Sequence, residues 1–153
     1  MQQPHHLAAA AARKLLLTFD RNLTRDWDDV WVITGPAFLP KKEGNKWIVR
    51  YEVLGDAEPN VAVPTHFWKV ILAQKGSNGV MASFLLPNER IDDSTPLSAF
   101  MVPLHKIEKA TGLIFFENLR GKLQPGAPLQ LPLLCNGNAC NLPPPMPKNN
   151  SHG

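Results

Sequence analysis

Two cysteines among 153 residues, Cys135 and Cys140, are too few for a disulfide framework or for a zinc site made of four cysteines. They could form one disulfide across a short loop or stay as reduced thiols, and we favour the thiols. No run of about 18 apolar residues occurs, because the longest candidate, residues 7–19, contains Arg13 and Lys14. The chain is therefore not expected to be an integral membrane protein.

A strong excess of charge is also missing from most of the chain. The formal net charge is +3, from 16 Lys and Arg against 13 Asp and Glu. Beyond Glu117 there is no acid, only Arg120, Lys122 and Lys148, so residues 1–118 carry no net charge. The basic total is therefore weak support for a phosphate-binding face.

The N-terminus has little in common with a targeting segment. Its first 19 residues contain no acid and are rich in Ala and Leu, which faintly resembles a mitochondrial presequence. They also contain no Ser and few basic residues, which argues against one. The alternative is an ordinary helix over residues 7–19, where strong helix formers occur without Gly or Pro.

The middle of the chain alternates short β-rich runs with turn residues. The expected strands are residues 30–34, 47–54, 67–73 and 80–86. Gly35-Pro36 is expected to end the first strand and Gly55-Asp56 the second. The polar, Gly-containing segment 74–79 predicts a hairpin between the last two.

A helix is predicted over residues 103–111, with Pro103 at its start and Gly112 as its C-cap. Together with the strands, it predicts an α+β fold with a central antiparallel sheet and flanking helices. Three parts are expected along the chain: an N-terminal helix in 1–22, a domain in 23–118 and an irregular tail in 119–153. The tail holds seven of the fifteen prolines.

Five ordered blocks resemble one protein family. They are LTRDWDDVWVITGPAFLP (23–40), WIVRYEVLG (47–55), NVAVPTHFWKVIL (60–72), LPNERI (86–91) and VPLHKIEKATGLIFF (102–116). The match is to the C-terminal half of the DNA/RNA non-specific endonucleases, the ββα-metal nucleases, and within them to the mitochondrial endonuclease G branch. The resemblance covers residues 23–116 and implies a partial ββα-metal fold.

This resemblance implies Mg²⁺-dependent (or Mn²⁺-dependent) hydrolysis of DNA and RNA with little sequence preference. In the family a His within Asp-Arg-Gly-His is the general base and an Asn on a helix binds the metal. The motif does not occur here, since Asp20-Arg21-Asn22 shares only its first two letters. The family's Asn and the Glu eight residues later fall on Ala9 and Leu17. We therefore expect this chain, as written, to hold no metal and to be inactive.

Three polar residues match family positions. Glu108 corresponds to an acidic position linked to activity in the endonuclease G branch, and is otherwise a polar helix residue. His66 lies among apolar residues and is expected to be structural. Asn88 matches a recurring Asn, although Asn after Pro is also ordinary turn chemistry.

Basic and aromatic residues offer a weaker indication of nucleic-acid binding. Lys41, Lys42 and Arg50 could contact phosphates, although a solvated loop is an equal or better interpretation. For the aromatic residues, core packing is favoured over base stacking: Trp27, Trp31, Trp47, Phe67 and Trp68.

Two classes of function stay open. In the first, the chain is a piece of a nuclease and Met1 is not the true start. In the second, it is a non-catalytic half-nuclease that binds nucleic acid weakly or docks onto an intact family member, since relatives form homodimers. The resemblance implies mitochondria as the compartment. We also expect poor solubility, because a sheet that lacks strands leaves an apolar edge exposed.

Overall fold

The computed structural model describes residues 23–55, 58, 60–76, 78–92 and 94–119. The helix expected over 7–19, both cysteines and nearly all of the Pro-rich tail lie outside these residues. The division into three parts stays a prediction. No helix in the described part of the chain is long and apolar enough to cross a membrane.

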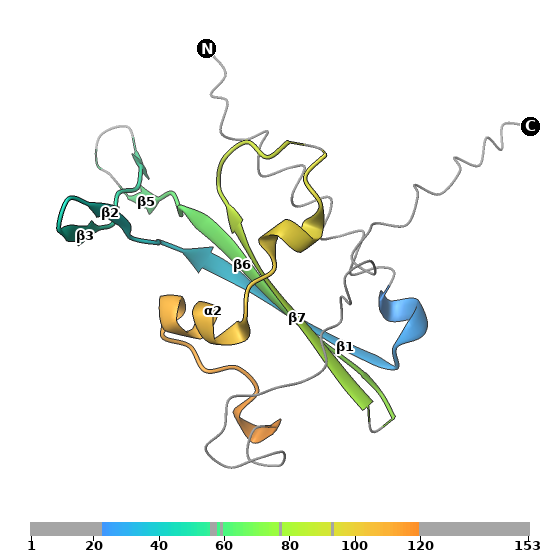
Figure 1. The fold of residues 1–153 in the computed structure, drawn as a ribbon. Coiled ribbons are helices and arrows are strands. Elements are labelled where there is room, and N and C mark those ends of the chain that lie inside the picture. The colour runs from blue at the N-terminus through green and yellow to red at the C-terminus, as the bar shows by residue number, and fades with distance from the viewer. Residues whose placement is uncertain (1–22, 56–57, 59, 77, 93, 120–153) are drawn as a thin grey trace, which may run out of the picture.

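A three-stranded antiparallel sheet forms the centre of the fold (Figure 1). Its strands are β1 (Asp29–Ala37), β6 (His66–Lys75) and β7 (Asn78–Pro87), in the order β1-β6-β7. The central strand β6 is buried over Trp68–Ala73, which explains its nearly continuous apolar sequence. The predicted α+β class with a central antiparallel sheet is confirmed.

The hairpin predicted from residues 74–79 is confirmed. Lys75 pairs with Asn78, and Gly76 supplies the positive φ of 56° that the turn needs. The backbone N–H of Gly76 donates to Asp28 at 3.0 Å, and the Lys75 ammonium donates to the Asp26 carbonyl at 3.0 Å. The turn is therefore tied to the segment that leads into β1.

The prediction that Gly35-Pro36 ends the first strand is wrong, since β1 continues to Ala37. Gly35 lies under the indole of Trp68, and a Cβ at this position would lie 2.5 Å from Trp68 Cζ2. The indole Nε1 donates to the Pro36 carbonyl at 3.0 Å. Proline is tolerated because β1 is an edge strand within the described residues.

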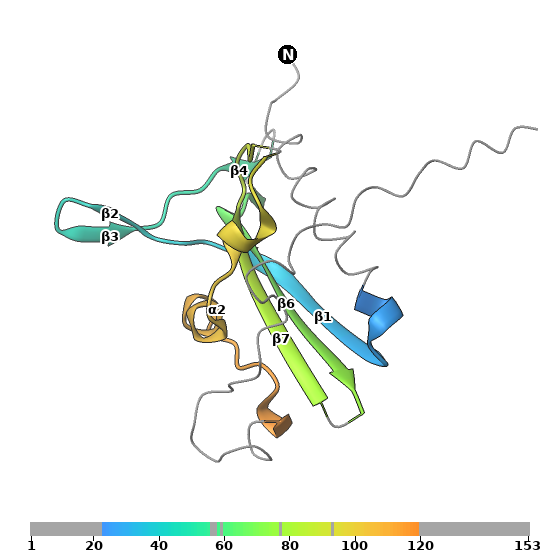
Figure 2. The same ribbon diagram turned by 45° about the vertical axis from the view of Figure 1, so that its right-hand side comes forward.

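The strand predicted over 47–54 is also wrong, because the chain breaks there into two short strands. β3 (Lys46–Ile48) pairs with β2 (Lys41–Glu43), whereas β4 (Val53–Leu54) pairs with β5 (Val61–Ala62). The two halves therefore have different partners. Figures 1 and 2 show the β2–β3 hairpin lying off the end of the main sheet.

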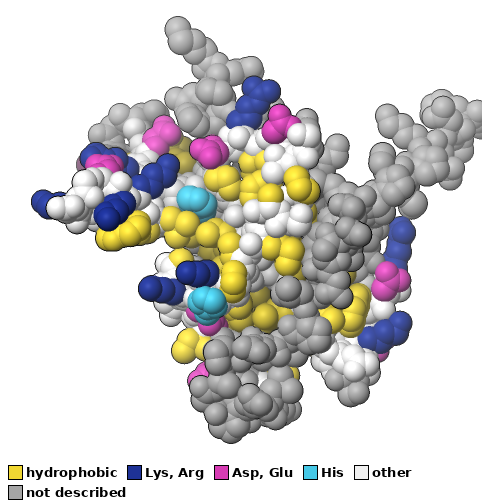
Figure 3. Space-filling model, in the orientation of Figure 1, with side chains coloured by type: hydrophobic (Ala, Val, Ile, Leu, Met, Phe, Trp, Pro, Cys, Tyr) yellow, Lys and Arg dark blue, Asp and Glu magenta, His cyan; other side chains and the backbone are white. Residues whose placement is uncertain are grey.

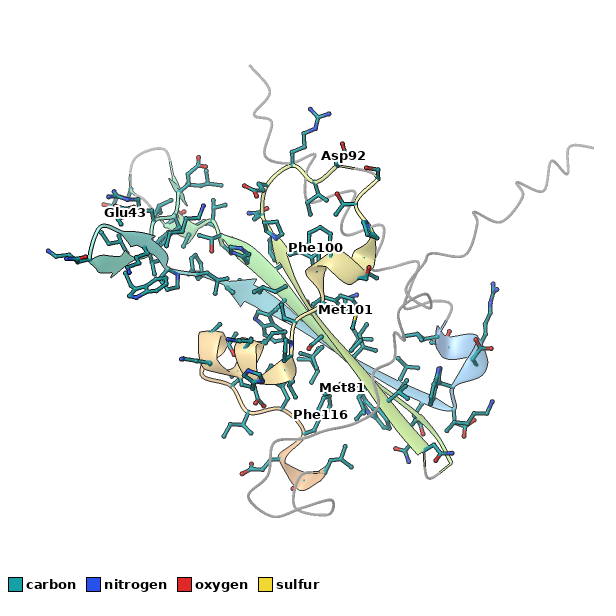
Figure 4. The ribbon with its side chains drawn as sticks, viewed as in Figure 1. Glu43, Met81, Asp92, Phe100, Met101 and Phe116 are labelled. Carbon is teal, nitrogen blue, oxygen red and sulfur yellow. The ribbon has the colours of Figure 1, made fainter. Side chains whose placement is uncertain are left out.

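Both faces of the main sheet are covered. On one face, a 3₁₀ turn (Leu97–Phe100) lies over a cluster of buried residues: Leu23, Ile71, Ala82, Phe84, Leu86 and Leu97. On the other, α2 (Leu104–Thr111) covers a second cluster: Ala37, Trp68, Val70, Met81, Leu104, Ile107 and Phe115. Figure 4 labels residues from both sides: Phe100 and Met101 beside the first cluster, Met81 in the second and Phe116 beside it.

The helix predicted over 103–111 is confirmed as α2, with Pro103 as its N-cap residue. It ends at Gly112, whose φ of 73° is left-handed, as a C-cap glycine requires. Upstream of the helix, the buried Ser83 hydroxyl donates to the Val102 carbonyl, and the Val102 N–H donates back to Ser83 at 3.0 Å. This exchange joins β7 to the start of α2.

The aromatic residues do not all follow the expectation of core packing. Trp68 is buried, with 5% of its surface exposed, and meets Phe115 edge to face at 5.2 Å. Trp47 contradicts the expectation, since 69% of its surface is exposed. Trp31 and Phe67 contradict it as well, because both are exposed. The strand predicted around Trp47 does form, as β3. Among the described residues β3 pairs only with β2, and no second layer covers the indole.

Candidate functional site

The candidate site lies at the end of the sheet where all three strands meet. Ala37, His66 and Pro87 stand side by side in the register of β1, β6 and β7. Thr65 holds this end together, because its hydroxyl donates to the Ala37 carbonyl at 3.1 Å and accepts from the Leu39 N–H at 2.8 Å. The β2–β3 hairpin leaves the sheet immediately after this point.

His66 begins β6 and is half-buried. Its Nδ1 lies 3.0 Å from the Thr65 hydroxyl oxygen. The single hydroxyl proton of Thr65 goes to the Ala37 carbonyl, so Nδ1 of His66 carries the proton in their mutual bond. The neutral imidazole therefore has its lone pair on Nε2, where it can accept a proton or a hydrogen bond.

Asn88 follows β7 and is bound to the same junction. Its backbone N–H donates to the Thr65 carbonyl at 2.8 Å, and its side-chain Nδ2 donates to the Pro64 carbonyl at 2.9 Å. This is turn chemistry that closes the end of the sheet. The structure thus brings His66 and Asn88 together on either side of Thr65.

Glu108 lies on α2 rather than on the strands. Its Oε1 accepts from the Phe115 N–H at 3.1 Å, and its backbone carbonyl accepts from Gly112 at 2.8 Å. The carboxylate therefore holds the segment after the helix against the core, where Phe115 is buried. This contact gives Glu108 a structural role; its expected supporting role in catalysis stays a prediction.

The three basic candidates lie on or beside the β2–β3 hairpin. Lys41 and Lys42 are exposed. Arg50 is different, because Nε and Nη2 of its guanidinium bind the two carboxylate oxygens of Glu43, each at 2.8 Å. This pair lowers the pKa of Glu43 and offsets the charge of Arg50. Figure 3 shows several Lys and Arg side chains over this hairpin, with others spread over the rest of this face.

Sequence reasoning missed Thr65 at the site and the exposure of Trp47 on the neighbouring hairpin. Thr65 precedes a strand and follows a proline, a pattern that favours local hydroxyl hydrogen bonds. Trp47 was assigned to the core, although it follows the turn sequence Glu43-Gly44-Asn45-Lys46, a signal for a short exposed hairpin.

A metal ion is implied by the family resemblance, and the described side chains do not fit one. Within the described ranges no group of three or more His, Cys, Asp or Glu is placed to share an ion. One oxygen of Glu108 is already bound to a backbone N–H. The described residues therefore form no metal site by themselves.

The protonation of His66 predicts a pH-dependent stability. Burial, helped by the positive charge of Lys41, lowers the pKa of folded His66 below its ordinary value of 6.5, and Glu89 acts in the opposite sense. Around and below pH 6.5 the unfolded state binds more protons than the folded state, so the folded state loses stability as the pH falls through 6.5 towards the lower pKa of folded His66. We expect a fall in melting temperature over this range that is smaller in His66→Gln.

Thermal unfolding followed by circular dichroism at constant ionic strength measures this effect. His105→Gln is the matched control, because His105 is an exposed histidine on α2. The control should show the same fall as the unchanged protein. An equal fall in His66→Gln would show that His66 does not contribute.

Comparison with known proteins identifies relatives. Nuclease C1 of Cunninghamella echinulata is 52% identical over 103 residues, which cover 66% of this chain and 40% of that nuclease. The mitochondrial Nuclease 1 of Schizosaccharomyces pombe is 47% identical over 104 residues (65% and 32% of the two chains). The mitochondrial endonuclease G of Homo sapiens is 41% identical over 103 residues (66% and 34%). The chain thus spans between about a third and two fifths of these relatives.

The fold comparison agrees with the sequence comparison. A chain from the crystal structure of the EndoG/EndoGI complex matches with a TM-score of 0.65 and 44% identity, over 69% of this chain and 43% of that one. The profile of the DNA/RNA non-specific endonucleases matches residues 18–122. These matches confirm the resemblance to the endonuclease G branch, and the chain belongs to the DNA/RNA non-specific endonuclease family.

Proposed function

We propose that this chain carries a nucleic-acid-binding part of a Mg²⁺- or Mn²⁺-dependent nuclease acting on DNA and RNA, and that by itself it does not hydrolyse phosphodiester bonds. One observation carries the second half of the proposal. The Asp-Arg-Gly-His motif of the family is absent from the sequence, so the general base has no counterpart.

The geometry of the remaining polar residues supports the same proposal. Asn88 and Glu108 use side-chain atoms to hold backbone segments in place. His66 is held by Thr65 at the start of a strand. These side chains serve the fold, and the loss of a general base and a metal ligand together typically costs several orders of magnitude in rate.

A plasmid-nicking assay with Mg²⁺ or Mn²⁺ tests the proposal. The purified chain should leave supercoiled plasmid intact, while an intact family nuclease nicks it under the same conditions. Metal-dependent nicking that disappears in Glu108→Gln would contradict the proposal, because this variant keeps the oxygen that accepts from Phe115 and removes only the charge. Metal-dependent nicking that survives in the variant and elutes with the chain would contradict the proposal as well.

We propose mitochondria as the compartment. Several relatives are mitochondrial nucleases by name, among them those of Schizosaccharomyces pombe, Homo sapiens and Saccharomyces cerevisiae. Import of a fluorescent fusion of the full chain, compared with a fusion beginning at Leu23, measures whether the N-terminal segment directs it there.

A second function, docking onto a second copy of this chain, is favoured by the edge strand β1. Among the described strands β1 pairs only with β6, and it exposes 43% of Trp31, 39% of Val32 and 37% of Ile33. An apolar edge with unpaired backbone groups can pair with the same edge of another molecule. The oligomeric state in solution tests this function.

A further inference from the structure

We propose that the β2–β3 hairpin, residues 41–48, contacts unpaired segments of nucleic acid, with Trp47 stacking on a base and Lys42 binding the adjoining phosphate. The inference deepens the proposed function and rests on its nucleic-acid substrate. It assigns to this hairpin a preference for single strands over duplexes.

Trp47 is placed to meet a flat ligand. It is the most exposed large apolar side chain of the described residues, at 69%. The hairpin that carries it is short and tight, with Gly44 at a φ of 58° in the first turn position. Figures 1 and 2 show this hairpin away from both core layers, so a base could approach the indole without displacing core residues.

The strand register places a cation beside the indole. Lys42 pairs directly with Trp47, and directly opposed residues in an antiparallel pair share one face, with Cβ atoms about 5 Å apart. A base stacked on the indole would therefore bring its phosphate within reach of an ammonium group. Aromatic and basic side chains combined in this way are characteristic of proteins that bind single strands.

The charge balance of the hairpin also favours an anionic ligand. Its only acid, Glu43, is bound by Arg50 through both carboxylate oxygens. Lys41, Lys42 and Lys46 make no ion pair with any residue that the structure describes. Lys42 therefore lies on the face of the exposed indole, while Lys41 and Lys46 on the opposite face add positive charge to the same hairpin.

The preference for single strands follows from the geometry of stacking. In a duplex the faces of the bases are covered by their neighbours, so an indole can reach a base only where the strand is unpaired. A phosphate contact alone would not favour the single strand, because both forms expose backbone phosphates. The stacking residue is therefore the one to test.

Fluorescence anisotropy of the full chain with a labelled oligothymidylate, in EDTA so that no strand is cut, measures the contact. We expect Trp47→Ala to weaken binding about tenfold, because stacking of one base on an aromatic side chain contributes about 1–3 kcal/mol in proteins that bind single strands. Trp47→Phe should retain most of the affinity. Lys42→Glu should weaken binding, and the matched control Lys109→Glu, an exposed charge reversal on α2, should weaken it less.

Two further readouts separate stacking from unfolding. Oligothymidylate should quench tryptophan fluorescence in the unchanged protein, and most of this quenching should be absent in Trp47→Phe. Binding of a duplex of equal length should change little in Trp47→Ala.

Each outcome decides a different question. If the unchanged chain binds neither probe, both this inference and the nucleic-acid part of the proposed function fail. If it binds but Trp47→Ala binds equally well, only the hairpin inference fails. A change of oligomeric state in Trp47→Ala with unchanged affinity for the oligonucleotide would assign Trp47 to a protein interface and overturn the inference.

Discussion

Gly35→Ala is expected to lower the free energy of unfolding by about 1–3 kcal/mol, as overpacking a filled core does. The added Cβ would lie 2.5 Å from Trp68 Cζ2 and 2.8 Å from Cε2. The indole cannot retreat freely, because it is bound to the Pro36 carbonyl and packed against Phe115. Urea unfolding followed by circular dichroism measures the change.

A double-mutant cycle tests the cause. In a Trp68→Leu background the added methyl group meets no indole, so Gly35→Ala should cost clearly less than it does in the unchanged protein. Equal costs in the two backgrounds would show that the close approach to Trp68 does not constrain Gly35. Trp68→Phe offers a milder background if Trp68→Leu does not fold.

Self-association through β1 is the second large effect that we expect. If two copies pair along this edge, each can bury at most the 39% of Val32 that the monomer exposes. Full burial of a valine contributes about 1.5 kcal/mol, so this part contributes about 0.6 kcal/mol per copy. Its loss from both copies in Val32→Lys should weaken the dimer roughly tenfold. It should also raise the soluble concentration, because lysine on an edge strand opposes pairing.

Sedimentation velocity over a range of concentrations measures the association. Val61→Lys is the matched control, since Val61 is 55% exposed but lies on β5, outside the main sheet. The control should associate as the unchanged protein does. A chain that is monomeric at every concentration, or an equal effect of both substitutions, would exclude the β1 interface.

The elements that the sequence predicted well are those with local signals. The β6–β7 turn contains Gly76 at a position that needs positive φ, and α2 lies between Pro103 and Gly112. These residues fix the backbone conformation within a few positions of their own place in the chain. Their effect can therefore be predicted without knowing which other segments pack against them. The α+β class follows from the same elements.

The failures share a non-local cause. Gly35-Pro36 has the sequence of a strand end, yet β1 continues through it. The indole of Trp68, from β6, fills the space that a side chain at position 35 would occupy. Residues 49–52 continue the β-like alternation of apolar and charged residues, yet the strands on either side of them pair with different partners. For the site, the resemblance supplied His66 and Asn88. Thr65 joins them, because its hydroxyl contacts His66 and its carbonyl accepts from Asn88, and this role became visible only through these hydrogen bonds.

The pairing of Ala37 with His66 has a consequence for how this fold can vary in length. The segment 38–65 leaves the sheet and returns to the same junction, so it behaves as one closed loop. Doubling the length of such a loop costs only about 0.6 kcal/mol of chain entropy. The β6–β7 turn has less freedom, because its short connection fixes the register of β7 against β6 and a slip by one residue would invert the faces of β7. Insertions should therefore accumulate in 38–65, and the reach of its hairpin can change while the sheet stays the same.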